Sequence, residues 1–357
     1  MYTDVSAFCV TPQTSLRDAI GQIDRSRLGI VLVVDEARRL VGTITDGDVR
    51  RAILAGMDLG QPTTALLTRK AGTKYARPIT ASIAGNQETW LRLMEDEHIL
   101  HLPLVDKEQR VAGLATLVEF VPKGPPIQAL IMAGGAGQRL RPLTNETPKP
   151  MLAVGDRPLL EIMIQQLRDA GIERVHIATH HQPEKISQHF GDGQEFGVNL
   201  SYVTEEKPLG TVGALGLMEP PKETLLVING DILTKVDFRS MVTYHREHGG
   251  DLTVGVRHYE IKVPYGVIEC EESMVCGVSE KPVLGFFVNA GIYLLEPIVH
   301  RFIPNGQPLD MPDLIRYLLN AGRQVVSFPV REYWMDIGQH ADYQHVQEEI
   351  KRWESDK

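Results

Sequence analysis

The sequence predicts an α/β protein whose larger part is a mainly parallel sheet with helices on both faces, preceded by a smaller α+β module. Three observations support this prediction. An internal repeat, at a shift of 71 residues, lies within residues 1–121. Prolines and a glycine then interrupt the chain at residues 122–126, as in a linker. Over residues 127–357, apolar strands alternate with helices of ~10 to 14 residues, which is typical of parallel sheets.

Composition and charge limit the classes of function. The chain of 357 residues is 43% hydrophobic and 23% charged, as expected for globular protein with two or three cores. Its net charge of -9 disfavours binding to nucleic acid or anionic membranes, which relies on clustered Lys and Arg. No apolar run approaches the ~18 residues of a membrane span. The three cysteines, Cys9, Cys270 and Cys276, form no paired framework. We therefore expect a cytoplasmic protein.

The repeat aligns VDEARRLVGTITDGD, residues 34–48, with VDKEQRVAGLATLVE, residues 105–119, without a gap. Each segment reads as a strand, a tight turn and a second strand, because apolar and β-branched residues flank a short charged turn. An amphipathic helix is expected before each hairpin, over residues 15–24 and 86–96. We therefore expect two copies of one unit, over about residues 1–60 and 61–121.

The second part begins with QALIMA, a buried strand at residues 128–133. Further strands and helices are expected in alternation: a helix at 158–171, a strand at 174–179, a helix at 181–191 and a strand at 224–230. Ligands of such sheets bind at the carboxyl ends of the strands. A cluster of glycines follows the first strand directly, at one of these ends.

Gly134, Gly135 and Gly137 can bring several backbone N–H groups to one anion, because glycine tolerates positive φ and has no Cβ to block the approach. A dinucleotide fingerprint is excluded, since Leu140 stands where its third glycine should be. A P-loop is excluded because no GK[ST] follows. A plain strand-to-loop turn is the alternative interpretation of the glycines alone.

Two cations follow this loop. Arg139 offers a forked set of donors suited to phosphate oxygens, and Lys149 is held between Pro148 and Pro150. GGAGQRLRPLT followed by PKPML resembles the signature of the sugar-phosphate nucleotidyltransferases, which join a nucleoside triphosphate to a sugar 1-phosphate and release pyrophosphate. The resemblance covers about residues 127–345, and later segments match in order. It implies a Rossmann-like nucleotidyltransferase domain.

The resemblance also implies roles for individual residues. Segment LGTVGAL, residues 209–215, is similar to a second glycine loop beside the nucleobase, and LVINGDIL and WMDIG are similar to the segments that carry two metal-binding aspartates. Mg²⁺ is the implied cofactor, because it takes one or two carboxylates and fills its other positions with phosphate oxygens and water. The implied nucleotide-binding residues are Ala133, Gly134, Gly135, Gly137, Glu205 and Gly210. The implied catalytic residues are Arg139, Lys149 and Asp231, and the implied metal ligands are Asp231 and Asp336.

VPYGVIE, EKP and VNAGIY are similar to the sugar pocket of the family. The resemblance implies that Gly266 lies at the sugar, that Glu280 accepts bonds from its hydroxyls, that Lys281 holds its phosphate and that Asn289 orients it. PLGTVGAL and VPYGVIE most resemble the mannose-1-phosphate guanylyltransferase branch. The fusion to a paired repeat resembles enzymes that make GDP-glucosamine for legionaminic acid, a sugar of cell-surface polysaccharides. Mannose 1-phosphate and glucosamine 1-phosphate are thus both candidate substrates.

Glu205 is relevant to which nucleobase is bound, since related enzymes place the side chain at this position against the edge of the base. A carboxylate accepts from the N1–H and N2–H₂ donors of guanine together, whereas uracil offers one imide N–H beside two carbonyls. This favours GTP, with a CTP- or UTP-using enzyme as the alternative. The opposing interpretation of Glu205 is a side chain that faces solvent.

GTITDGD, residues 42–48, and GLATLVE, residues 113–119, resemble the strand-to-helix ends of CBS motifs. In that family the Thr and the acid three residues later contact an adenine nucleotide, which implies such contacts for Thr45, Asp48 and Thr116. Glu119 departs from the pattern in the second copy. The pair either senses a nucleotide or helps the chain form a homo-oligomer. The presence of this pair also permits an alternative hypothesis, in which the chain is a catalytically inactive regulatory protein that senses a nucleotide.

Overall fold

The computed structural model describes the chain apart from residues 74–75, 98, 121–126 and 356–357. The chain divides into two compact units, Met1–Gly124 and Pro125–Lys357. The predicted linker, residues 122–126, lies outside the described residues. Within the described part of the chain, every helix is too short or too polar to cross a lipid bilayer.

The first unit contains two three-stranded sheets of the same topology, each with one parallel and one antiparallel pair. The strands are β1 (Cys9–Val10), β2 (Ile30–Val34), β3 (Leu40–Thr45), β4 (Ala81–Ser82), β5 (His101–Val105) and β6 (Val111–Thr116). The antiparallel pairing of Ile30 with Thr45 in the first sheet matches that of His101 with Thr116 in the second. The shift of 71 residues therefore holds in the strand register as well as in the sequence.

Helices cover these sheets. They are α1 (Leu16–Ser26), α2 (Asp46–Leu54), α3 (Thr63–Lys70), α4 (Gln87–Asp96) and α5 (Leu117–Phe120), after the short η1 (Ser6–Phe8). The two that periodicity predicted, over residues 15–24 and 86–96, are α1 and α4. The Ser15 side chain caps α1, and the Asn86 side chain caps α4 by accepting from the Thr89 backbone N–H. Trp90 and Met94, one turn apart on α4, are buried against the second sheet.

The second unit is built on a seven-stranded sheet of order β11-β10-β7-β12-β17-β14-β18. Neighbours from β11 to β12 are parallel, whereas β17 is antiparallel to both of its neighbours. The sheet strands are β7 (Gln128–Met132), β10 (Arg174–Thr179), β11 (Asn199–Thr204), β12 (Leu225–Asn229), β14 (Leu252–Lys262), β17 (Val283–Leu295) and β18 (Val325–Pro329). Short pairs join β8 (Ala153–Val154) to β9 (Arg157–Pro158), β13 (Ile232–Thr234) to β19 (Trp334–Asp336), and β15 (Val267–Glu271) to β16 (Met274–Ser279). The predicted α/β fold class with a mainly parallel sheet is confirmed.

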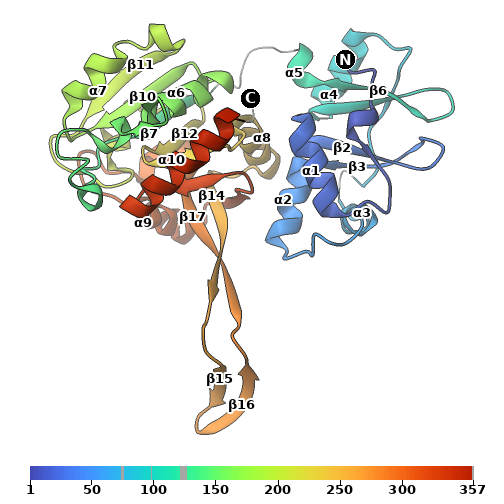
Figure 1. The fold of residues 1–357 in the computed structure, drawn as a ribbon. Helices are drawn as coiled ribbons and strands as arrows, with labels where there is room; N and C mark the ends of the chain where they lie inside the picture. The colour runs from blue at the N-terminus through green and yellow to red at the C-terminus, as the bar shows by residue number, and fades with distance from the viewer. Residues whose placement is uncertain (74–75, 98, 121–126, 356–357) are drawn as a thin grey trace. The chain divides into compact units, whose positions relative to one another are not determined.

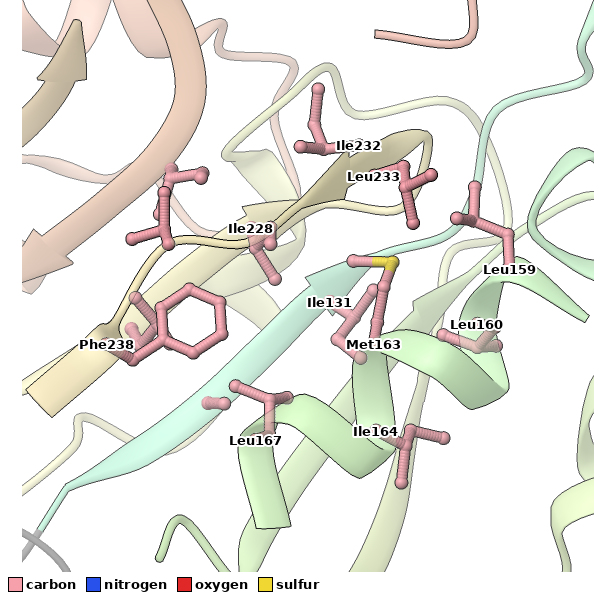
Figure 2. Packing of buried hydrophobic residues seen from close by; sticks show 14 of the residues in the cluster. Ile131, Leu159, Leu160, Met163, Ile164, Leu167, Ile228, Ile232, Leu233 and Phe238 are labelled. Atoms are coloured by element: carbon pink, nitrogen blue, oxygen red, sulfur yellow. The ribbon is translucent and has the colours of Figure 1, made fainter. Parts of the chain in front are cut away.

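Helices pack on this sheet through apolar faces. The helices are α6 (Leu159–Asp169), α7 (Pro183–Phe190), α8 (Phe238–His248), α9 (Met311–Asn320) and α10 (His340–Ser355). Figure 2 shows Met163 and Leu167 of α6 directed at Ile131 of β7 and Ile228 of β12. All four side chains are buried, and each contributes about 1.5–3 kcal/mol relative to exposure. This packing fixes the edge of the sheet at which β7 and β12 end.

Strands β14 and β17 continue beyond the sheet as a two-stranded arm that ends in β15 and β16 (Figure 1). We use the name arm for residues 257–288. β14 is buried near its start and exposed over its last residues, and β17 is exposed over its first residues and buried over its last six. The arm thus emerges from the core of the second unit into solvent.

Candidate active site

The site lies at the carboxyl ends of four neighbouring strands, β7, β10, β11 and β12. Three backbone bonds extend the ladder past these ends: Ala133 N–H to Ala178 O (2.8 Å), Gly230 N–H to Met132 O (2.9 Å), and Glu205 N–H to Thr179 O (2.8 Å). The segments that follow the four strands are therefore held side by side at one edge of the sheet. This edge is where ligands of parallel sheets bind.

The glycine loop, residues 133–137, follows β7. Ala133 is buried and its N–H belongs to the ladder, so it fixes where the loop begins. Of the three glycines, only Gly137 has a positive φ, 60°, and a Cβ there would lie 2.8 Å from Thr144 Cγ2. Gly134 and Gly135 therefore do not use the positive φ that glycine permits. Gly135 is exposed with nothing within 4 Å of a Cβ position, so its backbone is open to an incoming group.

Glu205 packs directly against this loop. A Cβ on Gly134 would lie 3.1 Å from Glu205 Oε1, and Glu205 Oε2 accepts from the Leu209 backbone N–H at 2.9 Å. Burial raises the pKa of Glu205, while the Leu209 N–H and His180 act in the opposite direction. The solvent-facing interpretation of Glu205 is wrong, because only 5% of the residue is exposed.

The two aspartates lie next to each other. Ile232, which follows Asp231, pairs with Asp336 across β13 and β19, and the Ile337 N–H donates to the Asp231 carbonyl at 3.0 Å. Partial burial raises the pKa of Asp336 first, and the negative charge of Asp231 raises it further. We call Asp231 and Asp336 the carboxylate pair.

Both predicted cations reach this pair. Lys149 Nζ donates to an Asp231 carboxylate oxygen in a half-buried ion pair. The guanidinium of Arg139 is exposed and lies 3.6 Å from a Cβ position on Gly338, two residues after Asp336. Lys149 and Arg139 both oppose the rise in the Asp336 pKa. The structure therefore brings together the glycine loop, both cations and both aspartates.

The carboxylate pair meets the requirements of a divalent cation. Mg²⁺ bound with nucleotides takes one or two protein carboxylates, and its remaining ligands are phosphate oxygens and water. The negative charge of Asp231 raises the pKa of Asp336, and a bound cation would relieve this repulsion between the two carboxylates. Among the described residues no group of three or more His, Cys, Asp or Glu offers an all-protein metal cage. The pair therefore fits Mg²⁺ that arrives with a phosphorylated ligand.

The second loop, the first four residues (209–212) of the segment LGTVGAL, depends on a residue that the sequence alone did not indicate. Gly210 has a φ of 80°, and a Cβ there would lie 2.7 Å from Asp310 Oδ1 and from the Leu309 carbonyl oxygen. Asp310 Oδ1 accepts from the Thr211 backbone N–H at 2.9 Å. The acid lies 99 residues from Thr211, so only the fold reveals the contact.

Asn289 lies on β17 opposite Val256 and accepts from the Gly291 N–H at 3.0 Å. Burial raises the pKa of Tyr293 to about 12, and the nearby charge of Asp231 acts in the same direction. The Asn289 side chain acts to lower the pKa of Tyr293. Tyr293, which was not predicted, thus connects Asn289 to the carboxylate pair. Its presence within the matched segment VNAGIY was the available signal.

The other predicted sugar residues lie elsewhere. Gly266 directly precedes β15, and Glu280 and Lys281 directly follow β16, so all three are on the arm (Figure 1). They are close to one another: a Cβ on Gly266 would lie 3.0 Å from Glu280 Oε2, and Lys281 Nζ is 3.9 Å from Glu280 Oε1. The side chains of Glu280 and Lys281 are 73% and 68% exposed. Within one chain the structure does not bring these residues to the carboxylate pair.

In the first unit, the predicted nucleotide contacts are engaged in local bonds. Thr45 and Asp48 form a capping box at the start of α2. The buried Asp48 carboxylate also accepts from Lys70 Nζ and from Arg51, each at 2.7 Å. In the second copy the Thr116 N–H donates to Glu119 at 3.4 Å. Binding of an adenine nucleotide there stays a prediction.

Comparison with known proteins agrees with this arrangement. A mannose-1-phosphate guanyltransferase of Saccharomyces cerevisiae is 32% identical over 227 residues, which cover 61% of this chain and 63% of that protein. A UTP–glucose-1-phosphate uridylyltransferase of Synechocystis is 32% identical over 238 residues, covering 61% of each chain. This chain thus spans somewhat less than two thirds of the length of these relatives.

A crystal structure from Bacillus anthracis, a candidate glucose-1-phosphate thymidylyltransferase in complex with sucrose, superposes with a TM-score of 0.52. It is 27% identical, and the match covers 62% of this chain and 94% of that one. Residues 3–55 match the CBS domain family, which confirms the predicted resemblance for the first copy of the repeat. Residues 128–352 match the nucleotidyl transferase family along nearly the whole of the second unit, and the chain belongs to that family.

Proposed function

We propose that the second unit transfers a nucleoside monophosphate from a nucleoside triphosphate to a sugar 1-phosphate and releases pyrophosphate. The observation that carries the proposal is the convergence of the glycine loop, Lys149, Arg139 and the carboxylate pair on one edge of the sheet. Membership of the nucleotidyl transferase family supports the same class of reaction.

In this reaction an oxygen of the sugar phosphate attacks the α-phosphorus of the triphosphate, and the bond from that phosphorus to the departing pyrophosphate breaks. Both reactants are anions, so holding them in line and neutralising the developing charge are the main tasks. The exposed backbone at Gly135 and the guanidinium of Arg139 are suited to the triphosphate. No general base is needed, since a sugar phosphate is already deprotonated at neutral pH.

Lys149 and Asp231 form one ion pair but have different roles, Lys149 toward a phosphate and Asp231 toward the metal ion. The pair holds the Lys149 ammonium at the edge of the sheet, where it can shift toward a phosphate when a ligand arrives. Asp231 and Asp336 would hold Mg²⁺, which when bound supplies positive charge to the triphosphate oxygens. The chain's own residues thus position the two reactants, and the cation reduces their repulsion.

GTP is the proposed nucleotide and a hexose 1-phosphate, either mannose 1-phosphate or glucosamine 1-phosphate, is the proposed acceptor. Support comes from the buried Glu205 carboxylate beside Gly134, which could accept from both guanine donors. The yeast relative is named for guanyl transfer, whereas the Synechocystis relative is named for uridylyl transfer. UTP is therefore the second candidate.

The test is a turnover matrix. Purified full-length chain with Mg²⁺ is given GTP, UTP, CTP or ATP together with mannose, glucosamine or glucose 1-phosphate, and pyrophosphate release is measured. We expect the highest kcat/KM with GTP. Faster turnover with UTP would reject guanine selectivity, and the absence of pyrophosphate with every pair would reject the transferase.

Asp231→Asn separates an enzyme from an inactive regulatory protein of the same fold. We expect a loss of about 100-fold or more in kcat, because the variant removes a carboxylate from the metal site and the negative charge that faces Lys149. Asp156→Asn, an exposed acid of the same unit, is the matched control and should leave turnover unchanged. Equal turnover of the two variants would contradict the role of Asp231.

A further inference from the structure

Apolar exposure in the protein is concentrated on the arm. Among the described residues, eighteen large apolar side chains are exposed, and eleven of them belong to the 32 residues of the arm. Their exposed fractions run from 42% for Phe287 to 74% for Tyr265. Scattered exposed apolar residues need no explanation, but a contiguous group marks a surface that is covered in the functional state.

Both faces of the arm are apolar. Val283 and Leu284 are adjacent in β17, as are Phe286 and Phe287, so members of each couple point to opposite faces of the ribbon. A single apolar face could lie flat on a neighbouring surface. Two apolar faces indicate that the ribbon is inserted between other elements.

Beyond the sheet, the two strands of the arm pair only with each other in the described part of the chain, so the arm resembles an isolated hairpin. β14 pairs with β18 only as far as Val256, and β17 pairs with β12 only from Ile292 onward. Beyond these positions, the outer edges of the ribbon have no neighbouring strand among the described residues. An isolated two-stranded ribbon is marginal in water, and such edges favour pairing with another chain.

The geometry of the root directs the arm away from its own site. After a register shift between Val254 and Val256, the ladder pairs every residue from Val256 opposite Asn289 to Lys262 opposite Val283. Arg257 holds the root by donating to the Val330 and Glu332 carbonyls, each at 2.9 Å. In this conformation the paired strands hold β15 and β16 outside the sheet that carries the carboxylate pair.

We propose that two copies of this chain exchange arms, so that Glu280 and Lys281 of each protomer complete the active site of its partner. This inference rests on the proposed function for what the two residues do there. The exchange unites groups that one chain keeps apart, namely the carboxylate pair on the sheet and the sugar-phosphate residues on the arm. It also covers both apolar faces of the ribbon.

The area available is sufficient for a stable dimer. Eleven side chains at these exposures present on the order of 1,000 Å² per arm, whereas a standard stable interface buries about 800 Å² per partner. Two arms exchanged about a twofold axis make this contact twice. A second copy of the chain is thus a sufficient occupant for the surface.

The first experiment measures association without reference to activity. Sedimentation equilibrium of the full chain should show a dimer, and Phe286→Ser with Phe287→Ser should raise its dissociation constant at least tenfold. Both side chains are already exposed in the single chain, so the change spares its core. The matched control replaces Tyr317 and Leu319, which are equally exposed on α9, with serine and should not shift the constant. A monomeric wild type, or equal constants for the two variants, would overturn the proposal.

The second experiment asks whether the arm acts on the partner. Chains carrying Asp231→Asn and Lys281→Ala are co-expressed with different tags, and the mixed dimer is purified through both tags. Each variant alone should be nearly inactive, whereas the mixed dimer contains one intact composite site and should recover about half of wild-type turnover. An inactive mixed dimer beside an active wild type would place the arm's action within its own chain and overturn the exchange. Absence of turnover in the wild type would instead reject the proposed function, and sedimentation would still decide whether the arms are exchanged.

Discussion

At the scale of single residues, Glu205 carries two tasks in one carboxylate. Oε2 holds the second loop through the Leu209 N–H, while Oε1 lies beside Gly134 of the glycine loop. Burial raises the pKa of Glu205 because the charged form loses hydration, and the Leu209 N–H restores part of that loss. A buried carboxylate with one oxygen already bonded has the other available for a ligand donor.

Glu205→Gln should reduce the preference for GTP over UTP about tenfold, which corresponds to ~1.4 kcal/mol of differential binding. The amide oxygen of glutamine can still accept from the Leu209 N–H, so the loop should remain folded. What is lost is the negative charge that, in the proposed complex with GTP, faces the guanine donors. The measurement is kcat/KM for both triphosphates. Glu206→Gln, at the exposed neighbouring position, is the control, and an unchanged ratio in Glu205→Gln would refute the assignment.

How far the site could be predicted differs from residue to residue. Matched motifs were enough to nominate Lys149, Asp231 and Asp336, which the structure places together. The ion pair of Lys149 with Asp231 could not be read from the sequence, since 82 residues separate its partners. Asp310 was missed for the same reason, because no motif connects it to the second loop.

At the scale of elements, the second loop shows why a glycine is required at one turn. Gly210 combines a positive φ with close contact to Leu309 and Asp310. Any other residue there would be strained in the left-handed backbone conformation, and its Cβ would clash with Leu309 and Asp310. The loop can pass Asp310 only as bare backbone. Its position beside Glu205 therefore depends on this residue.

Gly210→Ala should raise KM for the triphosphate at least tenfold, because the added Cβ must displace Asp310 and the loop with it. Gly306→Ala is the matched control: Gly306 has a φ of 63° but nothing within 4 Å of a Cβ position. Both variants should lose about 1 kcal/mol of stability to the left-handed conformation, so comparing them isolates the clash. Equal KM values would show that the loop does not position the nucleotide.

A histidine on β5 makes the first unit sensitive to pH. His101 lies against Gly29 of the other copy, and burial lowers its pKa to about 4, although the Leu28 carbonyl and Asp46 oppose the shift. The unfolded chain, with an ordinary histidine pKa near 6.5, binds a proton more readily than the folded chain. Above pH 6.5, His101 is neutral in both the folded and the unfolded chain, and the free energy of unfolding keeps its full value. As the pH falls from 6.5 toward 4, the unfolded chain binds a proton first and the free energy of unfolding decreases.

We expect the first unit to lose about 2 kcal/mol between pH 7 and pH 5 from this residue alone. Calorimetry of the full chain at the two pH values measures the loss. His101→Gln should show a smaller dependence, since glutamine does not titrate. An equal dependence in wild type and variant would assign the effect to other groups.

Periodicity predicted the elements in which local pattern and tertiary packing agree. The helix expected at residues 158–171 is α6, Leu159–Asp169, and the strand expected at 174–179 is β10. The arm was not predicted, since the sequence indicates that VPYGVIE and EKP lie near each other but not whether they turn toward their own sheet. The long ladder of β14 and β17 determines their direction, and this pairing is a tertiary property.

At the scale of the whole molecule, each unit has a hydrophobic core of its own. Core clusters of the first unit draw only on residues up to 120, including Leu16, Ile44 and Leu102. Those of the second unit draw only on residues from 127 onward, including Ile131 and Leu294. Separate cores imply separate cooperative units of folding.

The two units should therefore unfold in two steps that respond to different ligands. A ligand that binds one folded unit at 100 times its dissociation constant adds about 2.7 kcal/mol to that unit alone. With Mg²⁺ present, GTP should slow hydrogen exchange in β7 and β12, and AMP should slow it in β3 and β6, where Thr45 and Thr116 end their strands. Exchange measured peptide by peptide by mass spectrometry separates these responses. Protection of the first unit by AMP would favour nucleotide sensing by the CBS copies over a purely oligomerising role, whereas protection of neither copy would leave oligomerisation as the better account. Protection of β12 by AMP instead of GTP would contradict the assignment of ligands to units.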